Sequence, residues 1–196
     1  MAGLSNGGKM ESPSFFDKIL ILDFGSQYTQ LIARRVRECQ IYCEIHPYHI
    51  SLEEVRSLSP KGIIFSGGPA SVYEKSAPKC EPTLLQMGIP ILGICYGMQL
   101  IGDLLGGKVT HSEKREYGNA TLTIDQGGIL FKGLGRRGQQ LEVWMSHGDQ
   151  IRKLPSGFHP IAHSNNTPFA AIEEPSRKIY GLQFHPEVVH TQKGVD

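Results

Sequence analysis

The chain has 196 residues, enough for one domain with a proper hydrophobic core, and 39% of them are hydrophobic. Its 20 Lys and Arg residues balance its 19 Asp and Glu residues, which argues against a nucleic-acid groove or a polybasic membrane patch. No apolar stretch approaches the ~20 residues of a membrane span, and we expect no signal peptide.

Residues 1–16 are rich in Gly, Ser, Asn and Pro and have no hydrophobic periodicity. We therefore expect a disordered tail or an expression remnant over this segment. The folded domain is expected to occupy residues 17–196.

Apolar runs and helical segments alternate in the first half of the chain. Strand-length runs cover 18–23, 42–45, 62–65 and 89–94, and helical spacing covers 29–38, 51–56, 83–87 and 98–105. Ser51 is expected to cap its helix, with Glu54 three residues later as in a capping box. This alternation predicts an α/β fold with a mostly parallel central sheet and helices on both faces.

The chain contains four cysteines, which are too few for a disulfide scaffold and favour a reducing, cytoplasmic setting. Two of them form a short cluster with two histidines: Cys39, Cys43, His46 and His49. Only two residues separate the cysteine pair from the first histidine, fewer than in a zinc finger. A strand over 42–47 would also place Cys43 and His46 on opposite faces. We therefore expect no metal site.

After Gly106 and Gly107 the pattern changes to short strand-like runs separated by Gly, Pro, Asn and Asp. They cover 108–110, 120–124, 141–145, 159–163, 169–173 and 179–184. We interpret them as a small antiparallel sheet together with the last core strands of the same domain.

Three segments follow predicted parallel strands: residues 23–27, Ser66-Gly67-Gly68-Pro69 and the turn around Cys95. Ligands bind outside the carboxyl ends of the strands in such a sheet. We therefore expect these segments to meet at one edge.

Cys95 lies in Gly93-Ile94-Cys95-Tyr96-Gly97, between an apolar strand and a helical segment. A strand, a sharp turn and a helix form the nucleophile elbow of the α/β-hydrolases, where the nucleophile is serine. Flanking glycines allow strand and helix to approach closely, and a helix N-terminus favours the reactive thiolate. The alternative is a buried structural cysteine after a core strand.

His185-Pro186-Glu187 follows the predicted strand 179–184. In extended backbone, His185 and Glu187 share a face, and Pro186 keeps the residue before it extended. The carboxylate could then orient one ring nitrogen and leave the other for the sulfur. A simple surface turn is the alternative interpretation, and His147, with Asp149 nearby, is a second candidate base.

These motifs resemble the class I, or triad-type, glutamine amidotransferases. The resemblance rests on residues 93–99, 185–187 and 66–69 in their order and spacing, and it runs from about residue 18 to 189. It implies the flavodoxin-like class I glutaminase fold.

Within that class the chain is similar to the amidotransferase domains of GMP synthases. Three features carry this similarity: residues 21–28, Tyr96 directly after the cysteine, and Met145-Ser146-His147-Gly148-Asp149. The resemblance implies a domain that supplies ammonia to an ATP-pyrophosphatase, or synthetase, domain that aminates XMP to GMP.

The resemblance also implies a mechanism. The Cys95 thiolate attacks the carboxamide of glutamine, and backbone N–H groups of Gly68 and Tyr96 hold the oxyanion. His185 gives a proton to the leaving ammonia and then activates water to cleave the thioester. Glu187 orients His185. The glutamine itself would be held by Gln99, Ser146, His147 and Gly148.

No ATP-loop motif of the Ser-Gly-Gly-x-Asp-Ser type occurs in this sequence, so ATP and Mg²⁺ are expected in an absent synthetase domain and no cofactor is expected in this one. A dimerisation domain and a closing helix of the glutaminase domain are also expected beyond Asp196, and the isolated domain is expected to be at most weakly active. Three alternatives stay open: a glutaminase domain of the CTP or anthranilate pathway, a γ-glutamyl peptide hydrolase, and a non-catalytic binding domain.

Overall fold

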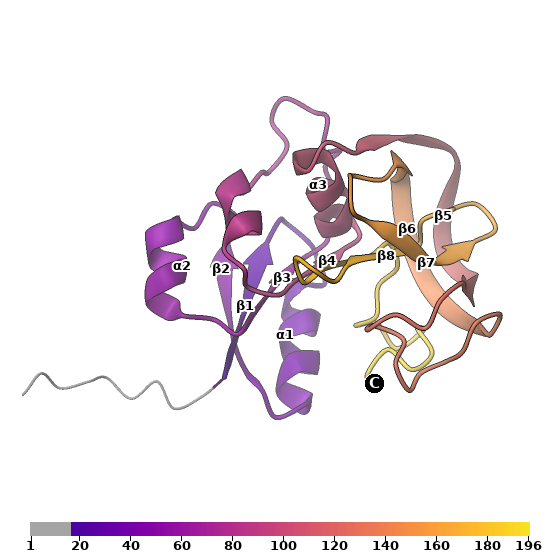
Figure 1. Ribbon diagram of the computed structural model, residues 1–196, viewed down its shortest axis with the longest axis horizontal. Coiled ribbons are helices and arrows are strands. Elements are labelled where there is room, and N and C mark those ends of the chain that lie inside the picture. Colours follow the sequence, from indigo (N-terminus) through magenta and orange to yellow (C-terminus); the bar gives the residue numbers. More distant parts are fainter. Residues whose placement is uncertain (1–16) are drawn as a thin grey trace, which may run out of the picture.

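The computed structural model describes residues 17–196 (Figure 1), so the tail expected over 1–16 lies outside the described residues. In this part of the chain, nine strands form one sheet in the order β2-β1-β3-β4-β9-β8-β7-β5-β6. The strands are β1 (Lys18–Asp23), β2 (Tyr42–Pro47), β3 (Gly62–Phe65), β4 (Ile91–Ile94), β5 (Lys108–Ile124), β6 (Gln140–Lys153), β7 (His159–Ser164), β8 (Ala171–Glu174) and β9 (Ile179–Leu182). The helices are α1 (Thr29–Glu38), α2 (Leu52–Leu58), α3 (Tyr96–Leu104) and the 3₁₀ helix η1 (Pro82–Gln86).

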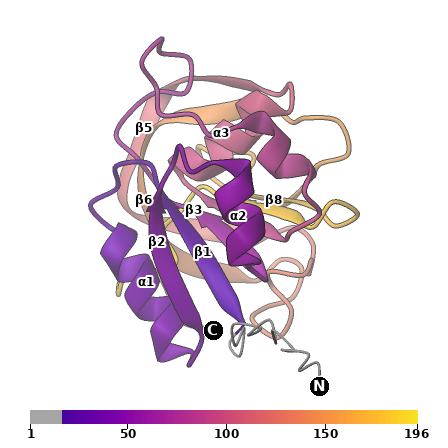
Figure 2. The same cartoon turned by 90° about the vertical axis from the view of Figure 1, so that its left-hand side faces the viewer.

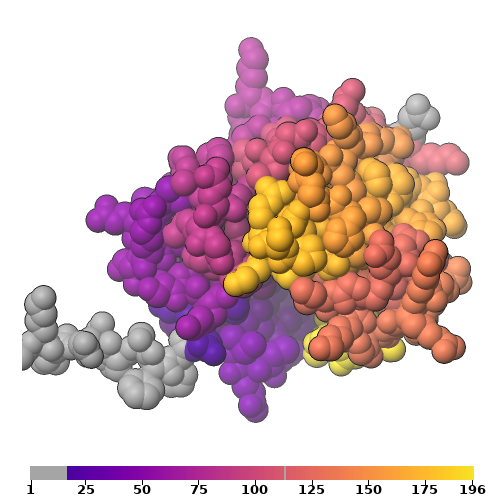
Figure 3. Space-filling view, viewed as in Figure 1, coloured from indigo at the N-terminus to yellow at the C-terminus, as the bar shows by residue number. Residues whose placement is uncertain are grey.

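The α/β fold with a parallel core is confirmed. Strands β2, β1, β3, β4 and β9 pair in parallel, and the remaining four pair antiparallel. The antiparallel strands continue the same sheet instead of forming a second, small one, because β8 pairs with β9 from Ala171↔Leu182 to Glu174↔Ile179. In Figure 3 a yellow segment from the C-terminal part of the chain accordingly lies between the indigo-to-magenta half and the orange half.

Helices cover both faces of the parallel core, as predicted. Figures 1 and 2 show α1 on one face and α2 on the other. Ile32 and Ala33 of α1 pack with Ile21 and Ile94, while α2, η1 and α3 pack on the opposite face against Leu20 and its neighbours. The residues Leu20-Ile21-Leu22 are fully buried, which explains the unbroken apolar run of β1.

Several element boundaries differ from the sequence pattern. β5 is one strand of 17 residues, whereas only its two ends, 108–110 and 120–124, look like strands in the sequence. Its pairing with β6 shifts register between His111 and Glu116, and the polar residues in between conceal the strand. The segment 83–87 forms a 3₁₀ helix, and β4 begins at Ile91. The Ser51 cap is confirmed, because Ser51 Oγ accepts a hydrogen bond from the Glu54 N–H at 3.2 Å.

The Cys-His cluster around β2 is divided between two faces of the sheet. Cys43 Sγ donates to the Ala33 carbonyl of α1 at 3.4 Å, while the His46 ring contacts Glu44 at 3.0 Å and Glu54 of α2 at 3.8 Å. Across residues 17–196, no group of three or more His, Cys, Asp or Glu side chains is placed to hold a metal ion. The helices of this region are too short or too polar to span a membrane.

Candidate active site

A cavity of about 590 Å³ opens at the carboxyl ends of the parallel strands. Its lining comes from the loops after β1 and β3, the β4–α3 turn, strands β5 and β6, and the segment after β9. The lining residues are Gly25, Ser26, Gln27, Tyr28, Gly68, Pro69, Ala70, Ser71, Cys95, Gln99, His111, Arg115, Tyr117, Ser146, His147, Gly148, Asp149 and His185. The predicted meeting of three loops at one edge is therefore confirmed.

Cys95 occupies the sharp turn that the sequence predicts. Its φ is 52° and its ψ is −106°, a backbone conformation that costs a non-glycine residue about 1–3 kcal/mol. The flanking glycines make this turn possible: a Cβ at Gly93 would lie 2.6 Å from Gly97 C, and one at Gly97 would lie 2.5 Å from Phe65 O. Strand β4, the turn at Cys95 and α3 thus place the thiol at the cavity, and the two glycines let the backbone of α3 pack directly against β4 and β3.

His185 lies between Cys95 and Glu187. Its Nδ1 is 2.8 Å from Glu187 Oε1, and both side chains are buried. Burial alone would lower the pKa of His185, but hydrogen bonds with Cys95 and Glu187 outweigh burial and raise the pKa to about 10. His185 and Cys95 both pack against Gly67: a Cβ added to this glycine would lie 3.2 Å from His185 Cε1 and 3.8 Å from Cys95 Cβ.

Contacts from α1 and from the residues that follow Glu187 fix the His-Pro-Glu segment. The Arg35 Nε of α1 donates to the Glu187 carbonyl at 2.9 Å, and the Thr191 hydroxyl donates to the His185 carbonyl at 2.6 Å. These contacts hold the backbone on both sides of Pro186. The segment is therefore an anchored part of the site and not a free surface turn.

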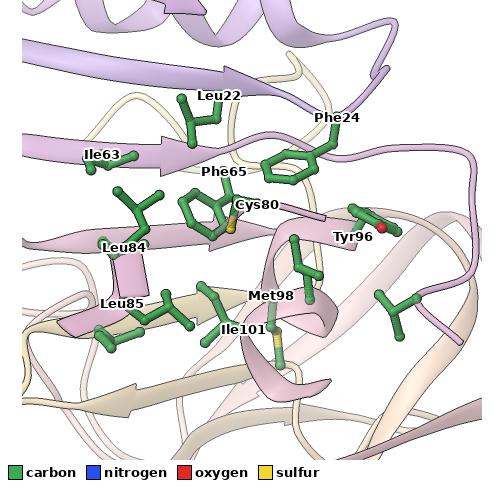
Figure 4. Close-up of a cluster of buried hydrophobic side chains, with 14 of the residues drawn as sticks. Leu22, Phe24, Ile63, Phe65, Cys80, Leu84, Leu85, Tyr96, Met98 and Ile101 are labelled. Carbon is green, nitrogen blue, oxygen red and sulfur yellow. The ribbon is translucent and has the colours of Figure 1, made fainter. Parts of the chain in front are cut away.

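The backbone N–H groups of Gly68 and Tyr96 have no protein acceptor within residues 17–196. Free N–H groups are expected at the first turn of α3. A Cβ at Gly68 would lie 2.6 Å from Phe24 O, so only glycine allows this approach. The Tyr96 side chain points away from the cavity into the core with Phe24 and Phe65 (Figure 4), and its hydroxyl donates to Pro78 O at 2.5 Å. Tyr96 can therefore serve the site through its backbone.

Gln99, one turn along α3 from Cys95, is buried and lies at the cavity wall. Its Nε2 donates to the Asp149 carbonyl at 2.8 Å and to Gln183 Oε1 at 3.2 Å. Gln183 in turn directs its Nε2 to Cys95 Sγ at 3.7 Å. The sequence reasoning missed Gln183. Its signal is the spacing of two from His185, which places both side chains on one face just after β9.

The segment Ser146-His147-Gly148 lies on β6 at the cavity wall. Cys95 Sγ is 3.6 Å from the Ser146 carbonyl. Nδ1 of His147 contacts the Asp149 carbonyl at 3.0 Å and Nε2 contacts Glu116 Oε2 at 3.2 Å. Both ring nitrogens of His147 are thus engaged within the protein, and the imidazole that meets the sulfur is that of His185.

Asp149 joins three elements beside the cavity. Its carboxylate accepts hydrogen bonds from the hydroxyls of Ser71 and Tyr73 in the loop after β3, and it lies 3.2 Å from His111 Nδ1 of β5. Ser71, Tyr73 and His111 are not among the site residues predicted from the sequence. No local pattern identifies them, because each contact joins residues that lie far apart in the chain.

Comparison with known proteins places this chain in a family. The model of the family "Glutamine amidotransferase class-I" matches residues 20–196. A "GMP synthase [glutamine-hydrolyzing]" of Heliobacterium modesticaldum is 56% identical over 180 residues, 92% of this chain and 34% of the relative. A protein of the same name from Nostoc punctiforme is 50% identical over 192 residues, 98% of this chain and 34% of the relative. The chain thus spans about a third of the length of these curated relatives.

Solved structures agree with the fold. The crystal structure of a Thermoplasma acidophilum protein, provisionally described as part of a GMP synthase, has a TM-score of 0.80 and 31% identity, covering 92% of this chain and 89% of that one. A glutamine amidotransferase from Thermotoga maritima has a TM-score of 0.68 at 23% identity, covering 87% of this chain and 76% of that one. The second similarity supports the fold alone.

Proposed function

The chain belongs to the class I glutamine amidotransferases, and we propose that it hydrolyses glutamine to glutamate and ammonia through a thioester at Cys95. The observation that carries this proposal is the contiguous set of Cys95, His185 and Glu187, in which Cys95 and His185 line the cavity and Glu187 contacts the His185 ring. A thiol, an imidazole and an orienting carboxylate are the parts of a nucleophilic acyl-transfer site.

In the first half-reaction the Cys95 thiolate attacks the carboxamide carbon of glutamine. The carbonyl oxygen becomes an oxyanion, and the free N–H groups of Gly68 and Tyr96 are its donors. Protonated His185 transfers a proton to the departing nitrogen, so that ammonia leaves and a γ-glutamyl thioester forms. His185 is then neutral, with its ring held by Glu187.

In the second half-reaction neutral His185 removes a proton from water, which attacks the thioester. The same oxyanion donors serve again, and glutamate leaves as the thiolate and the imidazolium are restored. The substrate's α-amino and α-carboxylate groups would be held by the walls that include Ser146, His147, Gly148 and Gln99. Because both nitrogens of His147 are engaged, its contribution would come through the backbone.

The ammonia would pass to a synthetase domain that aminates XMP to GMP. This part of the proposal is supported by the 50–56% identity to proteins named GMP synthase and by their greater length. The proposed glutaminase steps use side chains, backbone groups and water, while ATP and Mg²⁺ would act in the synthetase domain. Free cysteines throughout residues 17–196 support a reducing, cytoplasmic setting.

Release of glutamate from glutamine tests this function, measured with and without a separately supplied GMP synthase synthetase domain, ATP and XMP. We expect low turnover by the chain alone and stimulation by that partner with its substrates. Stimulation only by a synthase of the CTP or anthranilate pathway would contradict the assignment. Efficient turnover of γ-glutamyl peptides without any partner would instead indicate a peptide hydrolase.

A further inference from the structure

Gln183 is a fully buried polar residue in direct contact with the sulfur of Cys95. Its relative exposure is 0%, and its Nε2 lies 3.7 Å from Cys95 Sγ. The other end of its carboxamide, Oε1, accepts a hydrogen bond from Gln99 Nε2 at 3.2 Å. Gln183 takes no part in the thioester mechanism proposed for Cys95, His185 and Glu187.

The direction of this hydrogen-bond chain is fixed by a backbone group. The Asp149 carbonyl can only accept, so the neighbouring Gln99 atom, 2.8 Å away, must be Nε2. The Gln99 amide nitrogen has a second hydrogen, and Gln183 must therefore turn its oxygen toward it. Reversal of Gln183 would bring two donor groups together and point an oxygen lone pair at the sulfur. The N–H of Gln183 is thus held toward Cys95.

We propose that Gln183 is a further catalytic residue, which stabilises the thiolate of Cys95 with an N–H···S hydrogen bond, and that Gln99 is the positioning residue that sets its orientation. The proposal rests on the proposed function, in which Cys95 is the nucleophile. A hydrogen bond to a charged acceptor is stronger than one to a neutral acceptor, so this donor favours thiolate over thiol. Burial strengthens the effect because water does not compete for the amide.

A contact with the Ser146 carbonyl shows why a second donor to the sulfur matters. The Ser146 carbonyl, 3.6 Å from Sγ, can only accept and therefore favours the protonated thiol. His185 and Gln183 oppose it, because each brings an N–H group to the sulfur. His185 must release its proton during the reaction, whereas Gln183 keeps its hydrogens throughout. Gln183 can therefore hold the sulfur in both half-reactions.

Other ionisable groups share this environment and would be unchanged by a substitution at position 183. Glu187 stands behind His185, and further groups line the cavity from the loop after β1 and from β5 and β6: Tyr28, His111, Arg115, Tyr117, His147 and Asp149. A difference between wild type and a position-183 variant consequently reports the amide itself.

The test is the pH dependence of Cys95 alkylation by iodoacetamide in this chain, followed on the Cys95 peptide by mass spectrometry because the exposed thiol of Cys39 reacts as well. In Gln183→Met, which keeps a similar volume and has no N–H, we expect the midpoint of the profile to rise by about one pH unit. This shift corresponds to an about tenfold loss of thiolate at a fixed pH below the midpoint. In Gln99→Met the shift should have the same sign and be smaller, because Gln183 remains but is free to turn.

Gln150→Met is the matched control. Gln150 is also buried, and its carboxamide contacts Ser112 instead of the sulfur, so its profile should match wild type even if its melting temperature falls. An unchanged midpoint in folded Gln183→Met overturns the proposal. If Gln183→Met does not fold, an unchanged alkylation midpoint in Gln99→Met overturns the proposal instead.

This readout needs no turnover, so it is separate from the test of function. If Cys95→Ala retained glutaminase activity, the proposed function would fail even where the alkylation shift is observed. If Cys95 is essential and the midpoint does not move, only the role of Gln183 fails.

Discussion

Nδ1 of His185 lies 2.8 Å from Oε1 of Glu187, although only a proline separates the two residues in the chain. The carboxylate therefore fixes one ring nitrogen and turns the rest of the imidazole toward Cys95. Oε2 of the same carboxylate is buried and has no hydrogen-bond partner among residues 17–196. A buried carboxylate with so few partners contributes little to stability. This favours a role in which Glu187 orients the His185 ring and stabilises its protonated form.

Glu187→Gln tests this role. The amide keeps the shape of the carboxylate but not its charge, so the imidazolium loses its counter-ion. We expect the rate of glutamate release to fall by about 10²- to 10⁴-fold, as for the orienting carboxylate of other triads, while the melting temperature changes by a few degrees. Steady-state kinetics and thermal denaturation measure both quantities. A collapse of the melting temperature would indicate that the pair is mainly structural.

The protonation of His185 gives a second prediction. Burial alone would lower its pKa, but Cys95 and Glu187 raise it to about 10, above the value of about 6.5 for an unfolded chain. The stability that this group contributes is therefore complete below about pH 6.5 and is lost as the pH rises through about 10.

NMR of ¹⁵N-labelled histidine checks this titration directly. We expect the His185 ring to stay protonated at pH 8 in wild type and to lose its proton at lower pH in Cys95→Ala, where the partner sulfur is gone. The melting temperature of wild type should also fall more steeply between pH 7 and 10 than that of Cys95→Ala. A neutral His185 ring in wild type at pH 7 would rule out the thiolate–imidazolium pair.

Gly68→Ala tests the oxyanion donors. The new Cβ would lie 2.6 Å from Phe24 O, so the loop must move and take the Gly68 N–H with it. Loss of one such donor typically costs about 10²- to 10³-fold in kcat, and we expect a smaller change in KM.

Gly127→Ala serves as the control for that substitution, since a Cβ there meets nothing within 4 Å. It should leave kcat unchanged. If Gly68→Ala also retains the wild-type kcat, the Gly68 N–H does not hold the oxyanion.

The parallel half of the fold could be predicted closely from the sequence. β1 and α1 have the predicted bounds. The unbroken apolar run of β1 and the helical spacing of apolar residues in α1 each follow from which side chains are buried. Cys95, His185 and Glu187 could be identified because a glycine-flanked turn and a spacing of two are local features. The backbone strain at Cys95 follows from the same five residues.

What depends on distant contacts could not be predicted. The middle of β5 is polar, and it pairs with the edge strand β6. Its residues therefore show no alternation of apolar and polar side chains that would identify a strand. Gln99 and Gln183 meet across 84 positions, and Ser71 reaches Asp149 across 78. Such pairs become visible only when the order of strands is known.

Glutamate release by Cys95→Ala, assayed beside wild type with the synthetase domain, ATP and XMP present, tests the central claim most directly. Without the sulfur no thioester can form, so we predict that turnover falls to the background of the assay while the variant still binds glutamine and melts like a folded protein. Turnover near the wild-type rate would contradict the assignment of Cys95 as the nucleophile.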